Sequence, residues 1–296
     1  MDAIWSYWSA PSAPSHTARW KDLFHQLLAW AISLSAPGVV GYRKVLYTDS
    51  AGARLLAERL RLPLDEMHCT LDEIPSSLRR FWVLGKLHAY KQHRDPFVHL
   101  DSDVFLWKSL PDRLHRASIF SQNPERFSPE SQDYQPAAII EFLDRLSVAI
   151  PKTLRWYTAV GGNEAYCCGI LGGSRVDLLN QYAAEAIDLI EGHSSAFAQL
   201  PRDLEPNVVL EQYMLSAFCC YQVAVERNTT LRVDHLFESE RTSRTAEVSS
   251  SLGYTHLIGP AKLDDRILAK VNRYAEANLP EYHHRAKRTA REYSSS

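Results

Sequence analysis

Two aspartates separated by one residue, Asp101 and Asp103, directly follow the apolar run of residues 97–100. Side chains at positions i and i+2 of an extended chain point to the same side, so both carboxylates can face one point. Hard divalent cations such as Mg²⁺ and Mn²⁺ prefer oxygen ligands of this kind, which they share with the phosphates of a bound nucleotide. A short Asp-Ser-Asp sequence is also typical of a turn whose carboxylates cap the backbone. Because apolar residues flank the motif on both sides, up to Trp107, the sequence favours a metal site over a surface turn.

A second segment, residues 254–262, combines an imidazole, a glycine and a cation. The neutral nitrogen of His256 is a suitable third ligand for manganese. Gly259 lets a backbone approach a phosphate closely, and Lys262 can neutralise the charge of a leaving group. On its own, this segment fits an ordinary loop with a solvated lysine equally well. Together with the upstream aspartates, it indicates one site for a metal and a diphosphate.

Alternating strands and helices are expected to position the aspartate pair. In the first hundred residues, strands are expected at residues 3–8, 39–47, 64–69 and 97–100, and helices at residues 20–34, 51–62 and 75–92. This alternation predicts an α/β fold with a mainly parallel sheet and helices on both of its faces. Ligands of such folds bind beyond the carboxyl ends of the strands. Asp101 lies at that edge, directly after the fourth expected strand.

The second half of the chain is less regular. Strands are expected at residues 117–121, 165–171 and 221–226, and helices at residues 137–146, 175–191, 207–219 and 263–278. Residues 122–136 are expected to form a loop and residues 239–251 a mobile polar stretch, and contacts to an acceptor would come from such variable segments. We expect one large domain over residues 1–262, followed over residues 263–296 by a C-terminal helix and a basic tail.

The bulk composition excludes several classes of protein. The 296 residues, 45% of them hydrophobic, suffice for one large domain with a sizeable core. Lys and Arg number 33 against 35 for Asp and Glu, a formal net charge of -2, so no general field would attract nucleic acid. Four of the five cysteines form two adjacent pairs without a Cys-x-x-Cys spacing, which argues against a zinc site or a disulfide framework.

Neither export nor membrane insertion is expected from the sequence. Residues 1–16 lack the basic start and the continuous apolar run of a secretory signal. The most apolar stretch, residues 27–40, contains Ser33, Ser35 and Pro37 and is shorter than the roughly 20 residues that span a bilayer. We therefore expect a cytoplasmic protein, whose basic tail could make weak peripheral contact with an anionic membrane.

The order of the two motifs resembles that of a known family. A buried strand that ends in Asp101-Ser102-Asp103, followed late in the chain by a His-x-x-Gly-x-x-Lys motif, is similar to the GT-A fold glycosyltransferases. It is particularly similar to the glycogenin and lipopolysaccharide galactosyltransferase type. The resemblance implies a Rossmann-like α/β fold and a UDP-sugar donor bound through Asp101, Ser102 and Asp103. It also implies that Mn²⁺ or Mg²⁺ is held by both aspartates and His256, and that Lys262 contacts the diphosphate.

Further donor-binding residues are assigned through the same resemblance. Trp8, Tyr47 and Asp49 lie at the ends of the first two expected strands, and they resemble residues that bind the base and ribose of uridine. Trp8 would equally suit core packing. Lys86 lies on the helix before the aspartate pair and resembles the basic residue that contacts the donor, although it also fits a solvated helix lysine.

Glu211 and Gln212, on an expected helix, are assigned to catalysis. They resemble the acidic and amide pair that lines the donor-sugar pocket of retaining enzymes. In an inverting enzyme, a carboxylate in this region would be the general base that deprotonates the acceptor. The alternative is an exposed face of an ordinary helix.

The resemblance implies transfer of a hexose or N-acetylhexosamine from the UDP-sugar to a hydroxyl acceptor, which the sequence does not identify. Two other functions fit the same residues. A hydrophobic strand followed by Asp-Ser-Asp also resembles the haloacid-dehalogenase phosphohydrolases, in which Asp101 would attack phosphorus. A non-catalytic protein that binds a nucleotide-sugar on this fold would fit as well. An acyl-phosphate trapped on Asp101 would identify the phosphohydrolase, and donor binding without turnover would identify the binding protein.

Overall fold

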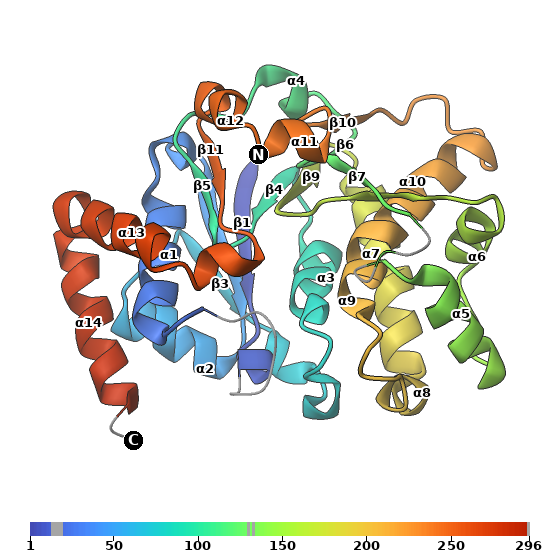
Figure 1. The fold of residues 1–296 in the computed structure, drawn as a ribbon, viewed down its shortest axis with the longest axis horizontal. Helices are drawn as coiled ribbons and strands as arrows, with labels where there is room; N and C mark the ends of the chain where they lie inside the picture. The colour runs from blue at the N-terminus through green and yellow to red at the C-terminus, as the bar shows by residue number, and fades with distance from the viewer. Residues whose placement is uncertain (13–19, 129–130, 132–133, 295–296) are drawn as a thin grey trace. The chain divides into compact units, whose positions relative to one another are not determined.

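The computed structural model of the chain describes residues 1–12, 20–128, 131 and 134–294. Within these residues, seven strands form one sheet in the order β10-β6-β9-β4-β1-β2-β3 (Figure 1). Adjacent strands are parallel in the pairs β1–β2, β2–β3 and β10–β6, and antiparallel in the pair β6–β9. The predicted α/β class, with a mainly parallel sheet flanked by helices, is therefore confirmed.

The strands are β1 (Asp2–Tyr7), β2 (Arg43–Thr48), β3 (Glu66–Cys69), β4 (Phe97–Leu100), β5 (Val104–Leu106), β6 (Ile119–Ser121), β7 (Pro124–Arg126), β8 (Glu164–Tyr166), β9 (Ile170–Gly173), β10 (Val233–His235) and β11 (Tyr254–His256). The α-helices are α1 (Leu23–Ser35), α2 (Ser50–Gly52), α3 (Val83–Gln92), α4 (Asp112–His115), α5 (Pro136–Arg145), α6 (Lys152–Ala159), α7 (Val176–Gly192), α8 (Ser194–Ala198), α9 (Pro206–Val208), α10 (Met214–Ala224), α11 (Glu240–Ser243), α12 (Ala246–Leu252), α13 (Asp265–Asn278) and α14 (Pro280–Ser294). Among the helices of the described residues, none is long and apolar enough to cross a membrane.

The chain divides into two compact units. The first unit comprises Met1–Glu73, Leu100–Leu110 and Ala246–Ser296. The second comprises Ile74–His99 and Pro111–Thr245. The aspartate pair and the late histidine motif both belong to the first unit, whereas Lys86, Glu211 and Gln212 belong to the second.

Strand β1 lies in the interior of the first unit. Its residues Ala3, Ile4 and Trp5 have no exposed surface, as expected for a strand covered on both faces. Parallel pairing with β2 places Trp5 opposite Leu46. Helix α1 follows, and it begins where the Asp22 carboxylate accepts a hydrogen bond from the backbone N–H of His25.

Two helices end the first unit. Helix α13 begins after its N-cap, Asp264, and directs Leu268 and Val271 inward. The basic residues that the sequence predicts in a tail are part of α14, which packs against α1 and buries Ala286 and Thr289. The predicted helical C-terminal extension is thus confirmed. Residues 295–296 of the expected tail lie outside the described residues.

The structure differs from three expectations for the second half of the chain. The strand expected at residues 221–226 is wrong, because α10 continues to Ala224 and packs against α6. The polar stretch expected at residues 239–251 contains α11 and α12, and Ser239 with Thr242 forms a capping box at the start of α11. The loop expected at residues 122–136 contains β7, and its residues 129–130 and 132–133 lie outside the described residues.

Candidate metal site

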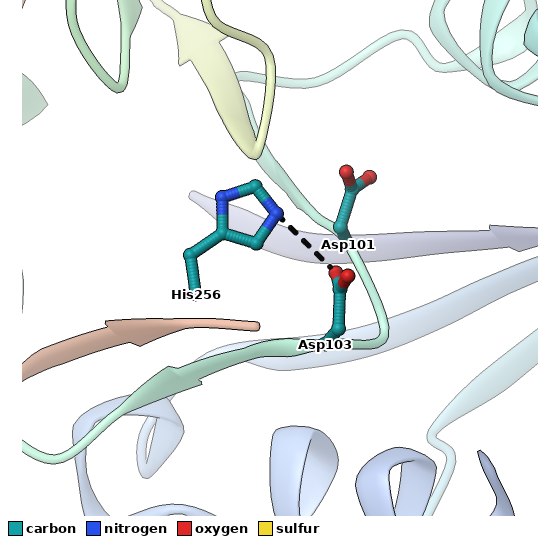
Figure 2. Close-up of side chains that lie close together, drawn as sticks. All are labelled: Asp101, Asp103 and His256. Carbon is teal, nitrogen blue, oxygen red and sulfur yellow. Dashed lines mark ion pairs between the residues drawn. The ribbon is translucent and has the colours of Figure 1, made fainter. Parts of the chain in front are cut away.

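The three predicted metal ligands lie together in the first unit. One ligand atom from each of Asp101, Asp103 and His256 lies within 4.8 Å of the other two (Figure 2). Two carboxylates and one imidazole form a donor set that suits Mn²⁺ and Mg²⁺ when further oxygen ligands come from phosphates or water. The residues that the structure brings together therefore fit the metal that the sequence predicts.

The aspartate pair lies in a turn, and the extended conformation assumed for it is wrong. The backbone N–H of Val104 donates to the carbonyl of Asp101 over 2.9 Å, which closes a four-residue turn between β4 and β5. The Asp101 carbonyl also accepts a hydrogen bond of 3.4 Å from the hydroxyl of Ser33, which in turn accepts one of 3.0 Å from the indole N–H of Trp5. Contacts to α1 and β1 thus hold the turn in place.

His256 reaches this turn through strand pairing. Strand β11 runs antiparallel to β5, and His256 lies opposite Val104, the residue directly after Asp103. The backbone N–H of Leu257 extends the pairing by donating to the carbonyl of Asp103 over 3.0 Å. The imidazole Nε2 consequently lies 3.5 Å from Oδ1 of Asp103.

Asp103 is the buried member of the group, with 3% of its surface exposed. Its other carboxylate oxygen lies 2.5 Å from the ammonium of Lys262. Burial alone would raise the pKa of Asp103, but the charges and hydrogen bonds of Lys262 and His256 hold this pKa well below its usual range. The carboxylate is therefore ionised at neutral pH, as a metal ligand must be.

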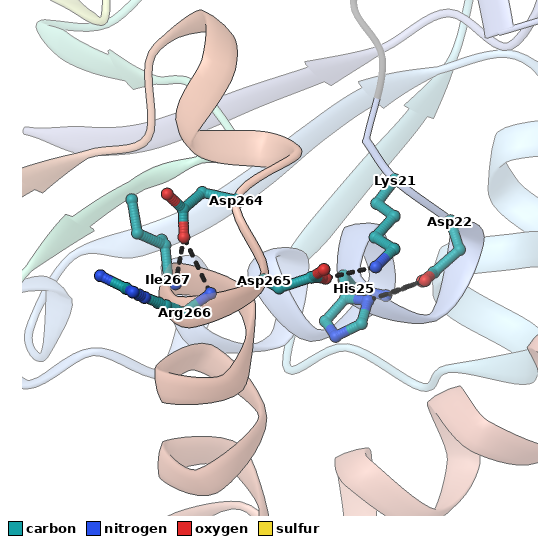
Figure 3. A network of polar contacts seen from close by, with 7 residues as sticks. All are labelled: Lys21, Asp22, His25, Asp264, Asp265, Arg266 and Ile267. Carbon is teal, nitrogen blue, oxygen red and sulfur yellow. Dashed lines mark hydrogen bonds and ion pairs between the residues drawn. The ribbon is translucent and has the colours of Figure 1, made fainter.

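The segment that carries Lys262 is fixed by a network of polar contacts (Figure 3). Lys21 donates its backbone N–H to the Lys262 carbonyl over 3.1 Å, and its ammonium pairs with Asp265. Asp264 caps α13 by accepting hydrogen bonds from the N–H groups of Arg266 and Ile267. The ammonium of Lys262 lies 5.8 Å from the ring centre of Trp20, a contact that the sequence did not suggest.

Gly259 has a backbone conformation that favours glycine. Its φ of 51° is in the left-handed region, and a Cβ atom added to it would meet no other atom within 4 Å. Gly259→Ala is therefore expected to lower the free energy of unfolding by about 1–2 kcal/mol through backbone strain alone. Urea denaturation measures this change.

Gly192→Ala is the matched control for this substitution. Gly192 ends α7, an added Cβ would also meet open space, and its φ is outside the left-handed region. Alanine there is expected to leave stability unchanged or to raise it by up to about 1 kcal/mol. Equal losses in the two variants would show that Gly259 has no special conformational role.

The residues predicted to bind the base and ribose are largely buried in the first unit. Trp8 is 7% exposed and Tyr47 3%, and the ring of Tyr47 stacks on His68 with the centroids 4.8 Å apart. The Asp49 carboxylate caps the helical segment that begins at α2, and it accepts hydrogen bonds from Ser9 and from the N–H of Gly52. These residues have evident packing and capping functions, and their contact with a nucleotide stays a prediction.

Lys86 and Glu211 form an ion pair in the interior of the second unit. Glu211 is fully buried in the π-helical segment Val209–Tyr213, and its Oε1 lies 3.0 Å from Nζ of Lys86 and 3.2 Å from the Tyr90 hydroxyl. The Lys86 side chain is only 12% exposed. The two alternatives of a solvated lysine and an exposed helix face are therefore wrong. A π-helical segment is itself a frequent feature of functional sites.

A family model described as a family of unknown function, DUF6734, matches residues 1–289. The chain belongs to this family. A search of curated proteins gives no match.

Solved structures of glycosyltransferases are similar to this DUF6734 protein. An active-site mutant of LgtC is 11% identical, with a TM-score of 0.44 over 94% of this chain and 96% of that chain. The galactosyltransferase LgtC in complex with donor and acceptor sugar analogues is 13% identical, with a TM-score of 0.42 over 93% of this chain and 94% of that chain. The bifunctional glycosyltransferase WbbM is 10% identical, with a TM-score of 0.39 over 88% of this chain and 46% of that chain. All three TM-scores are below 0.5, and the function proposed below rests on the side chains of the site.

Two polar residues of the second unit of this DUF6734 protein were not singled out in the sequence. The Tyr134 hydroxyl lies 2.6 Å from Oε2 of Glu125 and 2.5 Å from Oε1 of Gln212, so its single proton can be donated to only one of them at a time. Burial and the charge of Glu125 raise the pKa of Tyr134 well above its usual value, which keeps the phenol protonated. Tyr134 and Glu125 have no recognisable sequence motif. Their contacts join three segments that are distant in sequence, namely β7, the residues before α5 and the helical segment of Gln212.

Proposed function

We propose that the protein is a metal-dependent glycosyltransferase that transfers a hexose or N-acetylhexosamine from a UDP-sugar to a hydroxyl acceptor. The observation that carries this proposal is the convergence of Asp101, Asp103 and His256, with Lys262 in contact with Asp103. Carboxylates, an imidazole and a lysine together match the needs of a metal and a diphosphate better than those of a surface turn.

The proposed chemistry is electrostatic. Stabilisation of the departing diphosphate is what a bound Mn²⁺ or Mg²⁺ supplies. Asp101, Asp103 and His256 would hold the ion, and Lys262 would add a fixed positive charge for the phosphate oxygens. A Cβ atom added to Gly259 would meet no other atom within 4 Å, so a phosphate could approach this backbone. Orientation of the donor by the protein supplies a further part of the rate.

The remaining assignments are parts of the same proposal. Residues 1–262 would carry the whole site, with Trp8, Tyr47 and Asp49 near the nucleoside. Lys86 would contact the donor, and Glu211 and Gln212 would line the sugar pocket. Full burial and the ion pair favour a role for Glu211 in holding Lys86 over that of a general base. We further propose a cytoplasmic protein in which the basic side chains of α14 give at most weak attachment to anionic membranes.

A thermal-shift panel tests donor and metal together. The melting temperature is measured with UDP-glucose, UDP-galactose and UDP-N-acetylglucosamine, each with Mn²⁺ and each with a chelator. We expect a rise of about 5 °C that requires both a UDP-sugar and the metal, because ligands that bind only the folded state stabilise it. GDP-mannose with Mn²⁺ is the control. A shift that needs no metal, or no shift with any of the UDP-sugars, would contradict the proposal.

A further inference from the structure

A polar groove of about 270 Å³ lies wholly within the second unit. Seven residues line it: Lys152, Thr153, Gln181, Glu185, Tyr221, Gln222 and Glu226. They come from the start of α6, the middle of α7 and the end of α10 together with the residues just beyond it. None of them has a role in the proposed metal or donor site.

Glu185 is the central carboxylate of this groove. The buried hydroxyl of Thr153 donates to its Oε2 over 2.9 Å, which fixes the side chain. Burial raises the pKa of Glu185, although its hydrogen bonds with Thr153 and Gln181 act against the increase. Glu185 and Lys152 also line an adjoining groove of about 410 Å³, with Asp188 and His193. The two grooves therefore meet at Lys152 and Glu185.

Tyr221 supplies an aromatic surface to the same groove. The ammonium of Lys152 lies 5.2 Å from the centre of its ring and 3.1 Å from Oε1 of Glu226. The ring of Trp156 packs edge-on against Tyr221, with the centroids 5.6 Å apart. These contacts restrain the Tyr221 ring, and the ammonium of Lys152 lies over one of its faces, which leaves the other face for a ligand to stack on.

The chemistry of the lining selects a class of ligand. Three carboxylates, those of Glu185, Asp188 and Glu226, line the joined grooves together with a single lysine, so the field disfavours phosphates and other anions. The amides of Gln181 and Gln222 both donate and accept hydrogen bonds. An aromatic ring beside such groups suits a neutral ligand that is rich in hydroxyls and has an apolar ring face.

We propose that the two joined grooves form a carbohydrate-binding site, in which hydroxyls of an oligosaccharide bind Glu185 and Gln181 while one sugar ring packs on Tyr221. The volumes are near those of ordinary small-ligand pockets, enough for a short oligosaccharide. This site goes beyond the proposed transferase reaction, because it needs neither metal nor nucleotide. It would hold a glycan by residues distant in sequence from the metal ligands.

Saturation-transfer difference NMR on the full chain tests this site with lactose, maltotriose and chitotriose as probes, in the presence of a chelator. We expect at least one of these sugars to bind the native protein with a millimolar Kd. Tyr221→Ala and Gln181→Ala are each expected to weaken binding at least tenfold. Gln181 is exposed, so its substitution does not threaten the fold. Tyr293→Ala, at an exposed tyrosine of α14, is the matched control and should leave the Kd unchanged.

Three outcomes would overturn the carbohydrate site. These are no binding of any of the sugars, undiminished binding in both groove variants, and binding of tetralysine in place of the sugars, which would identify a site for cationic peptides. Asp103→Asn should leave sugar binding unchanged. Failure of this site is thus distinguishable from failure of the transferase proposal, because the probes are measured without donor or metal.

Discussion

Asp103→Asn is expected to lower metal-dependent turnover of a UDP-sugar by about a hundredfold or more while the protein stays folded. Asparagine has the same shape as aspartate but lacks its charge, so it removes an anionic ligand of the metal and the ionic partner of Lys262. Residues that merely orient a metal ligand change affinity or activity about 10–100-fold, and loss of a ligand itself should cost at least as much. Release of UDP in the presence of Mn²⁺ measures turnover, and circular dichroism confirms folding.

Asp264→Asn is the matched control for that experiment. It makes the same chemical change in the same unit, at an exposed carboxylate that caps α13 (Figure 3). Asp264 is not one of the three metal ligands. Asparagine caps helices about as well as aspartate, so turnover and stability should both stay close to those of the native protein. Full turnover in Asp103→Asn would rule out the proposed metal site, and equal losses in both variants would indicate a general effect on folding.

The sequence was sufficient to locate the aspartate pair but not to describe its backbone. The strand at residues 97–100 has the predicted bounds, and the pair follows it directly. The extended conformation predicted for the pair is wrong, because the structure has a turn there. The alternative expectation, that the carboxylates of such a turn cap the backbone, does not describe Asp103 either. The Asp103 carboxylate instead contacts His256 and Lys262, which lie more than a hundred positions later in the sequence. Only long-range packing decides between these two outcomes.

The position of His256 depends on a strand pair that local patterns do not indicate. Strand β5 is not part of the seven-stranded sheet and forms a separate two-stranded sheet with β11. Each of these two strands has only three residues. Such short strands have little periodicity, so their pairing has no signature in either segment alone. The motif resemblance predicted that the histidine and the aspartates meet, whereas the structure shows that the antiparallel register places them together.

The incorrect elements show where local propensity fails. Residues 221–226 contain tyrosine and two valines, which favour a strand, yet contacts with α6 continue the helix through most of them. In the stretch at 239–251, polar composition suggested mobility, but a capping box starts α11 there. The burial of Glu211 has no local signature either, because an acidic residue in a helix is ordinarily exposed, and contacts with Lys86 and Tyr90 of another helix make this burial tolerable.

The buried pair of Lys86 and Glu211 should show strong energetic coupling. Glu211→Gln leaves a lysine in the interior without its carboxylate, and Lys86→Met leaves a buried carboxylate without its ammonium. Breaking a buried ion pair on one side typically destabilises a protein by about 3–5 kcal/mol. The double variant removes both charges at once, so its loss should be smaller than the sum of the single losses by about 2 kcal/mol or more. Urea denaturation of the four proteins measures this cycle.

The exposed pair of Arg59 and Glu292 provides the control cycle. Its atoms are 2.7 Å apart, but both side chains are about half exposed, at 44% and 53%, so solvent should screen nearly all of the coupling. If the cycle at Lys86 and Glu211 were additive like this control, Glu211 would not hold Lys86 and could still serve as a base for the acceptor. Strong coupling, together with a raised KM for the donor in Lys86→Met, would instead identify Glu211 as a positioning residue that acts through Lys86. The two results therefore separate a structural anchor from a catalytic group at Glu211.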